Sequence, residues 1–314
     1  MMGCTALRST VSALSQARPI MVIIVVGTAF NIVGNYLLGF GKLGLPALGL
    51  AGLALATTLT WWGMFLALAC YTILHPTLRD YRFFQTLHHP KPRTLRQLVW
   101  GGVPIGSFSG LESGFFLIIM FWMGQLGTET LAAHQVVLQT IVVVFMIPLG
   151  ISFATTVRVG QWLGKRDLAG MQRATWVSMV ITIFFMVGGS LLFVLFPKQI
   201  IGIYLDVNKP ENEAIVALAV PLLNIAAVTM VLDGLQKAIY GALQGLQDTQ
   251  IPTALNVLGF WGVGLSVGYG LGFQLGMGSR GLWIGQSIAI ATVALLFSWR
   301  LYQLIGKRKQ HVLS

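Results

Sequence analysis

Long apolar runs separated by short polar stretches are the dominant pattern of the 314-residue chain. A helix needs about 20 largely apolar residues to cross the hydrocarbon core of a bilayer. A transmembrane β-barrel would instead show short segments of alternating hydrophobicity. The pattern therefore predicts an all-α membrane protein with eight transmembrane helices, at residues 20–40, 46–74, 97–123, 131–157, 174–196, 214–242, 251–273 and 281–304.

Composition and charge fit this assignment. Hydrophobic residues make up 55% of the chain, charged residues 9%, and the mean hydropathy is +0.78, outside the soluble range. With eight spans the connections alternate sides. The connections on one side of the membrane hold four of the twenty Lys and Arg residues (Lys42, Lys198, Lys209 and Arg280). The connections and termini on the other side therefore hold sixteen. By the positive-inside rule, both termini are expected in the cytoplasm of a multi-pass plasma (inner) membrane protein. The net charge of +11 is then a topology signal, and no nucleic-acid partner is expected.

Two segments at a constant offset of 232 residues indicate an internal repeat. "ALSQARPIM" (13–21) and "GLQDTQIPT" (245–253) are both polar turns with a proline at the entrance to a long apolar helix. At this offset Gly49 and Leu50 align with Gly281 and Leu282. The second half, residues 97–305, contains six predicted helices. Its counterpart would begin about 135 residues before Met1 and contain four more helices, so the chain is expected to be the last eight spans of a twelve-span protein.

Three stretches resemble the multidrug and toxic compound extrusion (MATE) transporters: "NYLLGFGKLGLPALGLAGLALAT" (35–57), "LGTETLAAHQVVLQTIVVVFMIPLGISFATTVRVGQWLGKRD" (126–167) and "DGLQKAIYGALQGLQDTQIP" (233–252). The resemblance implies spans 5–12 of a bilobed twelve-helix exporter, monomeric when complete, without a cofactor and driven by a proton or sodium gradient. Residues 1–74 would be the rest of the N-terminal lobe and 75–96 a basic cytoplasmic loop between lobes. Residues 97–305 would be the C-terminal lobe and 306–314 a cytoplasmic tail.

Glu112 and Asp233 are the two of the nine acidic residues that fall well inside predicted spans. An ionisable group at that depth is costly and usually functional. Such a carboxylate can take a proton, a metal cation or an organic cation, and this competition is the chemistry of antiport. No Lys or Arg lies deep in a span to neutralise the pair, and Lys237, one turn beyond Asp233 toward the cytoplasm, is the one candidate. The alternative is a structural role, in which each carboxylate bonds across helices.

The MATE resemblance assigns cation coupling to these two positions. "LES" (111–113) and "LDGLQ" (232–236) look like the family's acidic positions on the first and fourth helices of the C-terminal lobe, so Glu112 and Asp233 would bind H⁺, Na⁺ or an organic cation. Helical spacing suggests further side chains for a cavity that accepts bulky cations, although each could simply pack: Phe115, Met120, Gln135, Gln139, Gln236 and Tyr240. Pro148 with Gly150 is a candidate hinge, with static curvature as the alternative.

These features distinguish three classes of function. The first is a secondary antiporter that exports cationic or amphipathic small molecules in exchange for H⁺ or Na⁺. The second, a flippase for lipid-linked precursors, should have a basic cavity, which the spans do not provide. The third is an intramembrane enzyme, but neither paired aspartates for Mg²⁺ nor an HExxH motif occurs in the sequence, and no phosphate-binding loop suggests ATP as the energy source. The first class is favoured, and the 314 residues alone are not expected to transport.

Overall fold

The computed structural model describes residues 2–14, 17–41, 48–75 and 92–313. Within them, eight helices are long and apolar enough to cross a membrane, which confirms the predicted all-α membrane fold. The chain divides into two compact units, Met1–Leu95 and Arg96–Ser314. Residues 46–47 of the second predicted span, and residues 76–91 of the predicted loop between lobes, lie outside the described residues.

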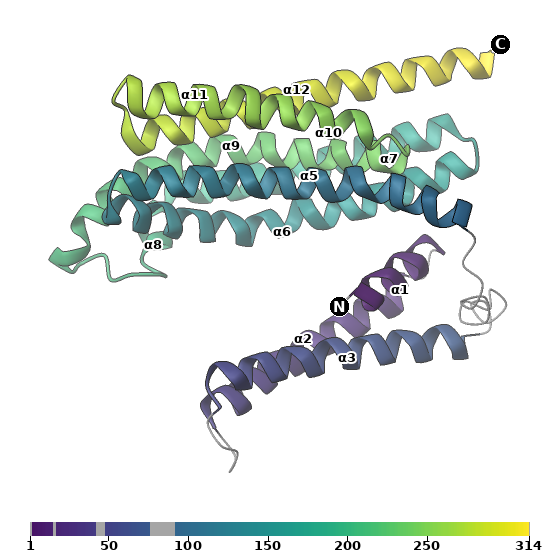
Figure 1. The fold of residues 1–314 in the computed structure, drawn as a ribbon, viewed down its shortest axis with the longest axis horizontal. Helices are drawn as coiled ribbons and strands as arrows, with labels where there is room; N and C mark the ends of the chain where they lie inside the picture. The colour runs from purple at the N-terminus through teal and green to yellow at the C-terminus, as the bar shows by residue number, and fades with distance from the viewer. Residues whose placement is uncertain (1, 15–16, 42–47, 76–91, 314) are drawn as a thin grey trace. The chain divides into compact units, whose positions relative to one another are not determined.

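The first unit contains α1 (Met2–Ala13), α2 (Ala17–Phe40) and α3 (Leu50–Leu74) (Figure 1). The hydropathy pattern did not predict α1, because it is too short and too polar to resemble a span. Its apolar residues nevertheless recur at helical spacing: Cys4 and Val11 are buried in a small core with Ile20 and Leu68. Helix α1 is therefore an amphipathic helix that packs on the α2–α3 pair.

The second unit is a bundle of long helices that lie side by side (Figure 1). Helix α9 is central to it, packing against α6, α7 and α12. Most helices extend beyond the predicted spans, because polar residues at a helix end continue the helix without being apolar. The elements are α5 (Pro92–Gln125), α6 (Thr128–Gly164), α7 (Leu168–Leu195), α8 (Pro197–Ile201), the 3₁₀ turn η1 (Pro210–Asn212), α9 (Glu213–Gly245), α10 (Gln250–Asn256), α11 (Leu265–Tyr269) and α12 (Gly278–Leu313).

The C-terminal halves of α6 and α9 approach closely through glycine. A Cβ atom on Gly241 would collide with the backbone of Ser152, and one on Gly245 would collide with Val159. The Thr156 hydroxyl donates a hydrogen bond of 2.9 Å to the Gly241 carbonyl oxygen across this contact. Small residues at such crossings let backbones pack closely in a membrane, where apolar burial contributes little to helix association.

The seventh predicted span, 251–273, is not a uniform α-helix. Between α10 and α11 lies the π-helix η2 (Val257–Gly264), and a second π-helix, η3 (Gly270–Gln274), follows α11. Glycines in η2 face α12 at close range, with Gly259 against Val293 and Gly264 against Ala289. Periodicity along a uniformly apolar segment does not distinguish a π-turn from an α-turn, so the sequence could not predict these features. Single π-helical turns within α-helices are frequent at functional sites.

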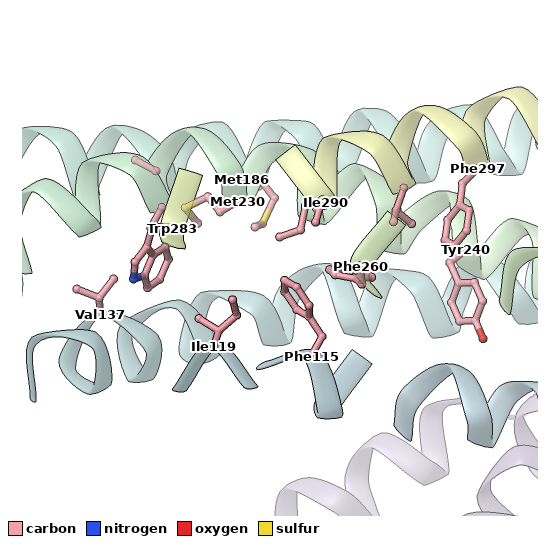
Figure 2. Close-up of a cluster of buried hydrophobic side chains, with 14 of the residues drawn as sticks. Phe115, Ile119, Val137, Met186, Met230, Tyr240, Phe260, Trp283, Ile290 and Phe297 are labelled. Atoms are coloured by element: carbon pink, nitrogen blue, oxygen red, sulfur yellow. The ribbon is translucent and has the colours of Figure 1, made fainter. Parts of the chain in front are cut away.

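The core of the second unit is rich in aromatic side chains (Figure 2). Phe115 and Phe260 lie next to each other, with ring centroids 5.0 Å apart. Nearer the C-terminal end of α9, Tyr240 stacks on Phe108 at 3.9 Å and on Phe297 at 5.9 Å. These rings fill the space between α5, α9, η2 and α12 and fix the positions of the helices that surround the candidate site.

Candidate functional site

A cavity of about 490 Å³ lies between α5, α6, α9 and α12. Its wall is mostly apolar, with aromatic and methionine side chains, and it contains two carboxylates from different helices. Ligand sites are typically concave and apolar with a few polar groups that orient the ligand. The lining residues are Glu112, Ser113, Phe116, Leu117 and Met120 on α5; Leu138, Ile141, Val142 and Phe145 on α6; Ala226, Thr229, Met230 and Asp233 on α9; and Trp283, Gln286 and Ile290 on α12.

Glu112 is paired with Lys237. The Lys237 Nζ atom lies 2.5 Å from Oε1 and 2.6 Å from Oε2 of Glu112, and the two side chains are 6% and 17% exposed. The expectation that both membrane carboxylates lack a basic neighbour is therefore wrong for Glu112. The Cα atom of Lys237 lies one turn nearer the C-terminal end of α9 than that of Asp233, but the long lysine side chain brings the ammonium group to the carboxylate of Glu112.

Two aromatic rings also face the ammonium group of Lys237. Its Nζ lies 5.4 Å from the ring centroid of Phe108 on α5 and 5.3 Å from that of Phe145 on α6. A cation this close to a ring face is attracted by the ring quadrupole. Three helices, α5, α6 and α9, thus meet at one buried positive charge.

Asp233 lines the cavity beside this ion pair and interacts electrostatically with Lys237 and Glu112, but it bonds to neither. Among the described residues no group donates a hydrogen bond to its carboxylate or forms an ion pair with it. Asp233 and Lys237 are four residues apart on α9, so they share one helix face. The structure therefore differentiates the two predicted carboxylates: one is paired and the other is open to the cavity.

The face of α5 that lines the cavity differs from the predicted one. At about 100° per residue, the lining residues Ser113, Phe116, Leu117 and Met120 lie within about 140° of Glu112 in one rotational sense. Phe115 lies about 60° in the opposite sense. Its ring is fully buried in the hydrophobic core against Phe260 (Figure 2). Phe115 is therefore not in the cavity wall, whereas Met120 is.

The other predicted lining residues do not line the cavity either. Gln135 contacts Met120, its Nε2 atom lying 3.6 Å from the sulfur, and Gln139 is exposed on another face of α6. Gln236 is fully buried away from the cavity wall, because its position on α9 is rotated about 60° from Asp233. Tyr240 lies two turns below Asp233, where stacked rings fill the space.

Neutral polar groups lie toward the other end of the cavity. Gln286 is 5% exposed, and its Oε1 atom has no hydrogen-bond partner within the described residues. The Thr229 and Ser287 hydroxyl oxygens lie 2.5 Å apart between α9 and α12. His134 is buried edge-on to Trp283, at a centroid separation of 5.5 Å. Gln286, Thr229 and Ser287 were not predicted, because single amides and hydroxyls on an apolar helix carry no distinctive pattern.

The α5 turn that carries Glu112 is held by η2. The Trp261 indole Nε1 donates a hydrogen bond of 3.0 Å to the Leu111 carbonyl oxygen, and the Trp261 ring covers Gly114. The candidate hinge residues are on α6, which continues as one helix through Pro148, which is buried, and Gly150, which is exposed. Proline at 148 removes one backbone donor and so leaves the Val144 carbonyl without its usual helical partner.

Comparisons with known proteins identify the family. The MatE family model matches residues 104–270. The chain is 48% identical over 303 residues to a probable multidrug resistance protein NorM of Synechocystis sp., covering 96% of this chain and 66% of that protein. It is 40% identical to the multidrug resistance protein NorM of Burkholderia vietnamiensis, covering 96% of this chain and 65% of that protein. The chain thus spans slightly less than two thirds of these relatives.

Solved structures show the same fold at low sequence identity. The eukaryotic MATE transporter AtDTX14 superposes with a TM-score of 0.79 at 22% identity, covering 96% of this chain and 66% of that one. A MATE crystal structure in complex with MaL6 gives a TM-score of 0.80 at 21% identity, with 94% and 64% coverage. Together with the match to the family model, which covers more than half of the sequence, these similarities show that the chain belongs to the MatE family of multi-pass membrane transporters, the multidrug and toxic compound extrusion family.

Proposed function

We propose that the chain forms the larger part of a multidrug efflux transporter, a secondary antiporter that exports cationic or amphipathic small molecules in exchange for H⁺ or Na⁺. The observation that supports this most directly is the 490 Å³ apolar cavity with an unpaired carboxylate, Asp233, in its wall. An apolar wall accepts the body of an amphiphile, and a desolvated carboxylate attracts its positive charge.

The proposed exchange follows from electrostatics. A carboxylate in an apolar cavity is stabilised by a bound organic cation, a metal cation or a proton, and these exclude one another because they neutralise the same charge. A gradient that loads the site with H⁺ or Na⁺ on one side of the membrane therefore favours release of the organic cation there. Phe116 and Met120 would contact the apolar body of the cargo.

The rest of the architecture is proposed by analogy with the bilobed family. The Arg96–Ser314 unit would correspond to the C-terminal lobe and Met1–Leu95 to part of the N-terminal lobe. Both termini would lie in the cytoplasm of a protein embedded in inner-membrane lipid and monomeric when complete. Pro148 and Gly150 would allow α6 to bend as access alternates, since proline and glycine lower the cost of bending a helix.

A chimera tests this function. This chain covers 66% of the Synechocystis relative. The expected register assigns the missing part to the first four spans, so these spans of the relative would be joined ahead of this chain. Inverted membrane vesicles containing the chimera should move ethidium under an imposed H⁺ or Na⁺ gradient, applied separately. The 314 residues alone, and the chimera with Asp233→Asn, should not. Equal ethidium movement by the chimera and its Asp233→Asn variant would contradict the proposal.

The flippase alternative is not favoured. Lys237 is the one buried cation near the cavity within the described residues, and Glu112 already neutralises it. A lipid pyrophosphate would meet the unpaired Asp233 carboxylate and would be repelled by it.

A further inference from the structure

The charges around the cavity are one cation and two anions. Among the described residues, Glu112 and Asp233 are the ionisable side chains in the cavity wall, and Lys237 is the ionisable group bonded to either of them. When all three are ionised, the net charge is −1. Near the ion pair, α6 contributes the uncharged Phe145, and α12 contributes Gln286 and Ile290 to the wall. One uncompensated negative charge therefore faces the cavity.

We propose that Lys237 is a specificity-determining residue that sets the capacity of this cavity to one monovalent cation. Its ammonium group occupies Glu112 as a built-in cation and leaves Asp233 as the carboxylate that exchanges. This inference rests on the proposed function and refines it, because it assigns different roles to two carboxylates that the family resemblance treats alike.

The geometry favours Glu112 over Asp233 as the partner of Lys237 in this structure. The ammonium group bonds to both Oε atoms of Glu112 and lies between the rings of Phe108 and Phe145. An organic cation that approached Glu112 would have to displace a tethered ammonium group held by both oxygens. The same cation meets no such competitor at Asp233, so exchange is expected there.

The position of Lys237 on α9 makes a distinctive prediction for Glu112→Gln. Removal of the Glu112 charge frees the ammonium group, and Asp233 is four residues away on the same helix face. Lys237 would then pair with Asp233 and block it. Glu112→Gln should therefore weaken cation binding strongly, although Glu112 does not itself take the cargo cation. Removing the lysine as well should restore binding.

The test is equilibrium binding of tetraphenylphosphonium to the purified 314-residue chain in lipid nanodiscs, because this chain contains the three charged residues on which the inference rests. We expect Asp233→Asn and Glu112→Gln each to weaken binding at least about tenfold, the effect of losing one favourable charge contact. Glu112→Gln/Lys237→Gln should bind within about threefold of wild type, because Asp233 is again a lone carboxylate. Asp233→Asn/Lys237→Gln should also recover binding, because Glu112 is then free.

The control is Lys165→Gln, which removes an exposed lysine outside the cavity wall and should leave binding unchanged. Size-exclusion profiles show whether each variant is folded, and either double variant alone decides the matter if one single variant misfolds. If wild type binds the cation and neither folded double variant recovers binding, the role of Lys237 is refuted while the cation cavity stands. If wild type does not bind at all, both the proposed function and this inference fail.

Discussion

The ion pair between Glu112 and Lys237 allows a stability prediction to be worked from the structure. Glu112→Gln keeps the shape of the side chain but removes the charge that Lys237 Nζ contacts at 2.5 and 2.6 Å. The lysine side chain is 6% exposed, so its ammonium group loses its partner without gaining water. Removing one member of a buried ion pair typically costs about 3–5 kcal/mol.

Two features of the site adjust this magnitude. The rings of Phe108 and Phe145 face the ammonium group in both the wild type and the variant, so they do not change the difference. Asp233, one turn away on α9, offers a replacement partner, so we expect a loss of about 2–3 kcal/mol, below the full range. Lys237→Met should cost less, about 1–2 kcal/mol, because Glu112 lines the cavity and its carboxylate can be hydrated there.

The assay is reversible unfolding of the purified chain in mixed detergent micelles, followed by circular dichroism, for the wild type, both single variants and the double variant. Replacing both partners of a buried pair is often close to neutral, so Glu112→Gln/Lys237→Met should lie within about 1 kcal/mol of wild type. The double-mutant cycle should then give a coupling energy of about 2 kcal/mol or more. A double variant that loses the sum of the single losses would refute the reasoning, because it would mean that the two side chains contribute independently.

Three further outcomes are expected. Gly241→Ala should destabilise the chain by about 1–3 kcal/mol, because the new Cβ collides with the α6 backbone. The control Gly110→Ala should not, because no atom lies near its Cβ position. Equal unfolding curves for the two variants would contradict the close α6–α9 packing. Trp261→Phe should lower the free energy of unfolding by about 0.5–1.5 kcal/mol, because it leaves the Leu111 carbonyl without its indole donor. An unchanged free energy of unfolding would mean that this hydrogen bond contributes nothing to stability. Pro148→Ala should slow gradient-driven ethidium efflux by the chimera while leaving tetraphenylphosphonium affinity unchanged, and normal efflux would exclude a hinge there.

The sequence was sufficient for the fold because the membrane imposes a strong requirement. Each span must present about 20 apolar residues, and this length signal survives even where side-chain identity is uninformative. Helix ends were less well predicted, since α5 and α6 continue into polar residues that a hydropathy pattern excludes. Helix α1 was missed because an amphipathic helix on a membrane protein resembles a polar connection.

The site could be predicted only in part, because the prediction neglected the angular position of residues around the helix and the length of the lysine side chain. Glu112 and Asp233 stood out because charges are rare in spans, and both line one cavity. Spacing of three or four residues placed Phe115 as close to Glu112 as Phe116, although the two residues lie on opposite sides of it around the helix. Depth along the helix suggested that Lys237 was too far toward the cytoplasm, because that estimate used its Cα position and neglected the length of its side chain.

We propose that organic cations, Na⁺ and H⁺ neutralise the same carboxylate, Asp233. Competition at equilibrium tests this proposal most directly. Flow dialysis would measure tetraphenylphosphonium bound to the chain in nanodiscs while Na⁺ or H⁺ concentration is raised at constant ionic strength. We predict one bound organic cation per chain, displaced competitively by at least one of these ions, and binding that is at least about tenfold weaker in Asp233→Asn. Binding that neither ion displaces, or that survives Asp233→Asn undiminished, would contradict it.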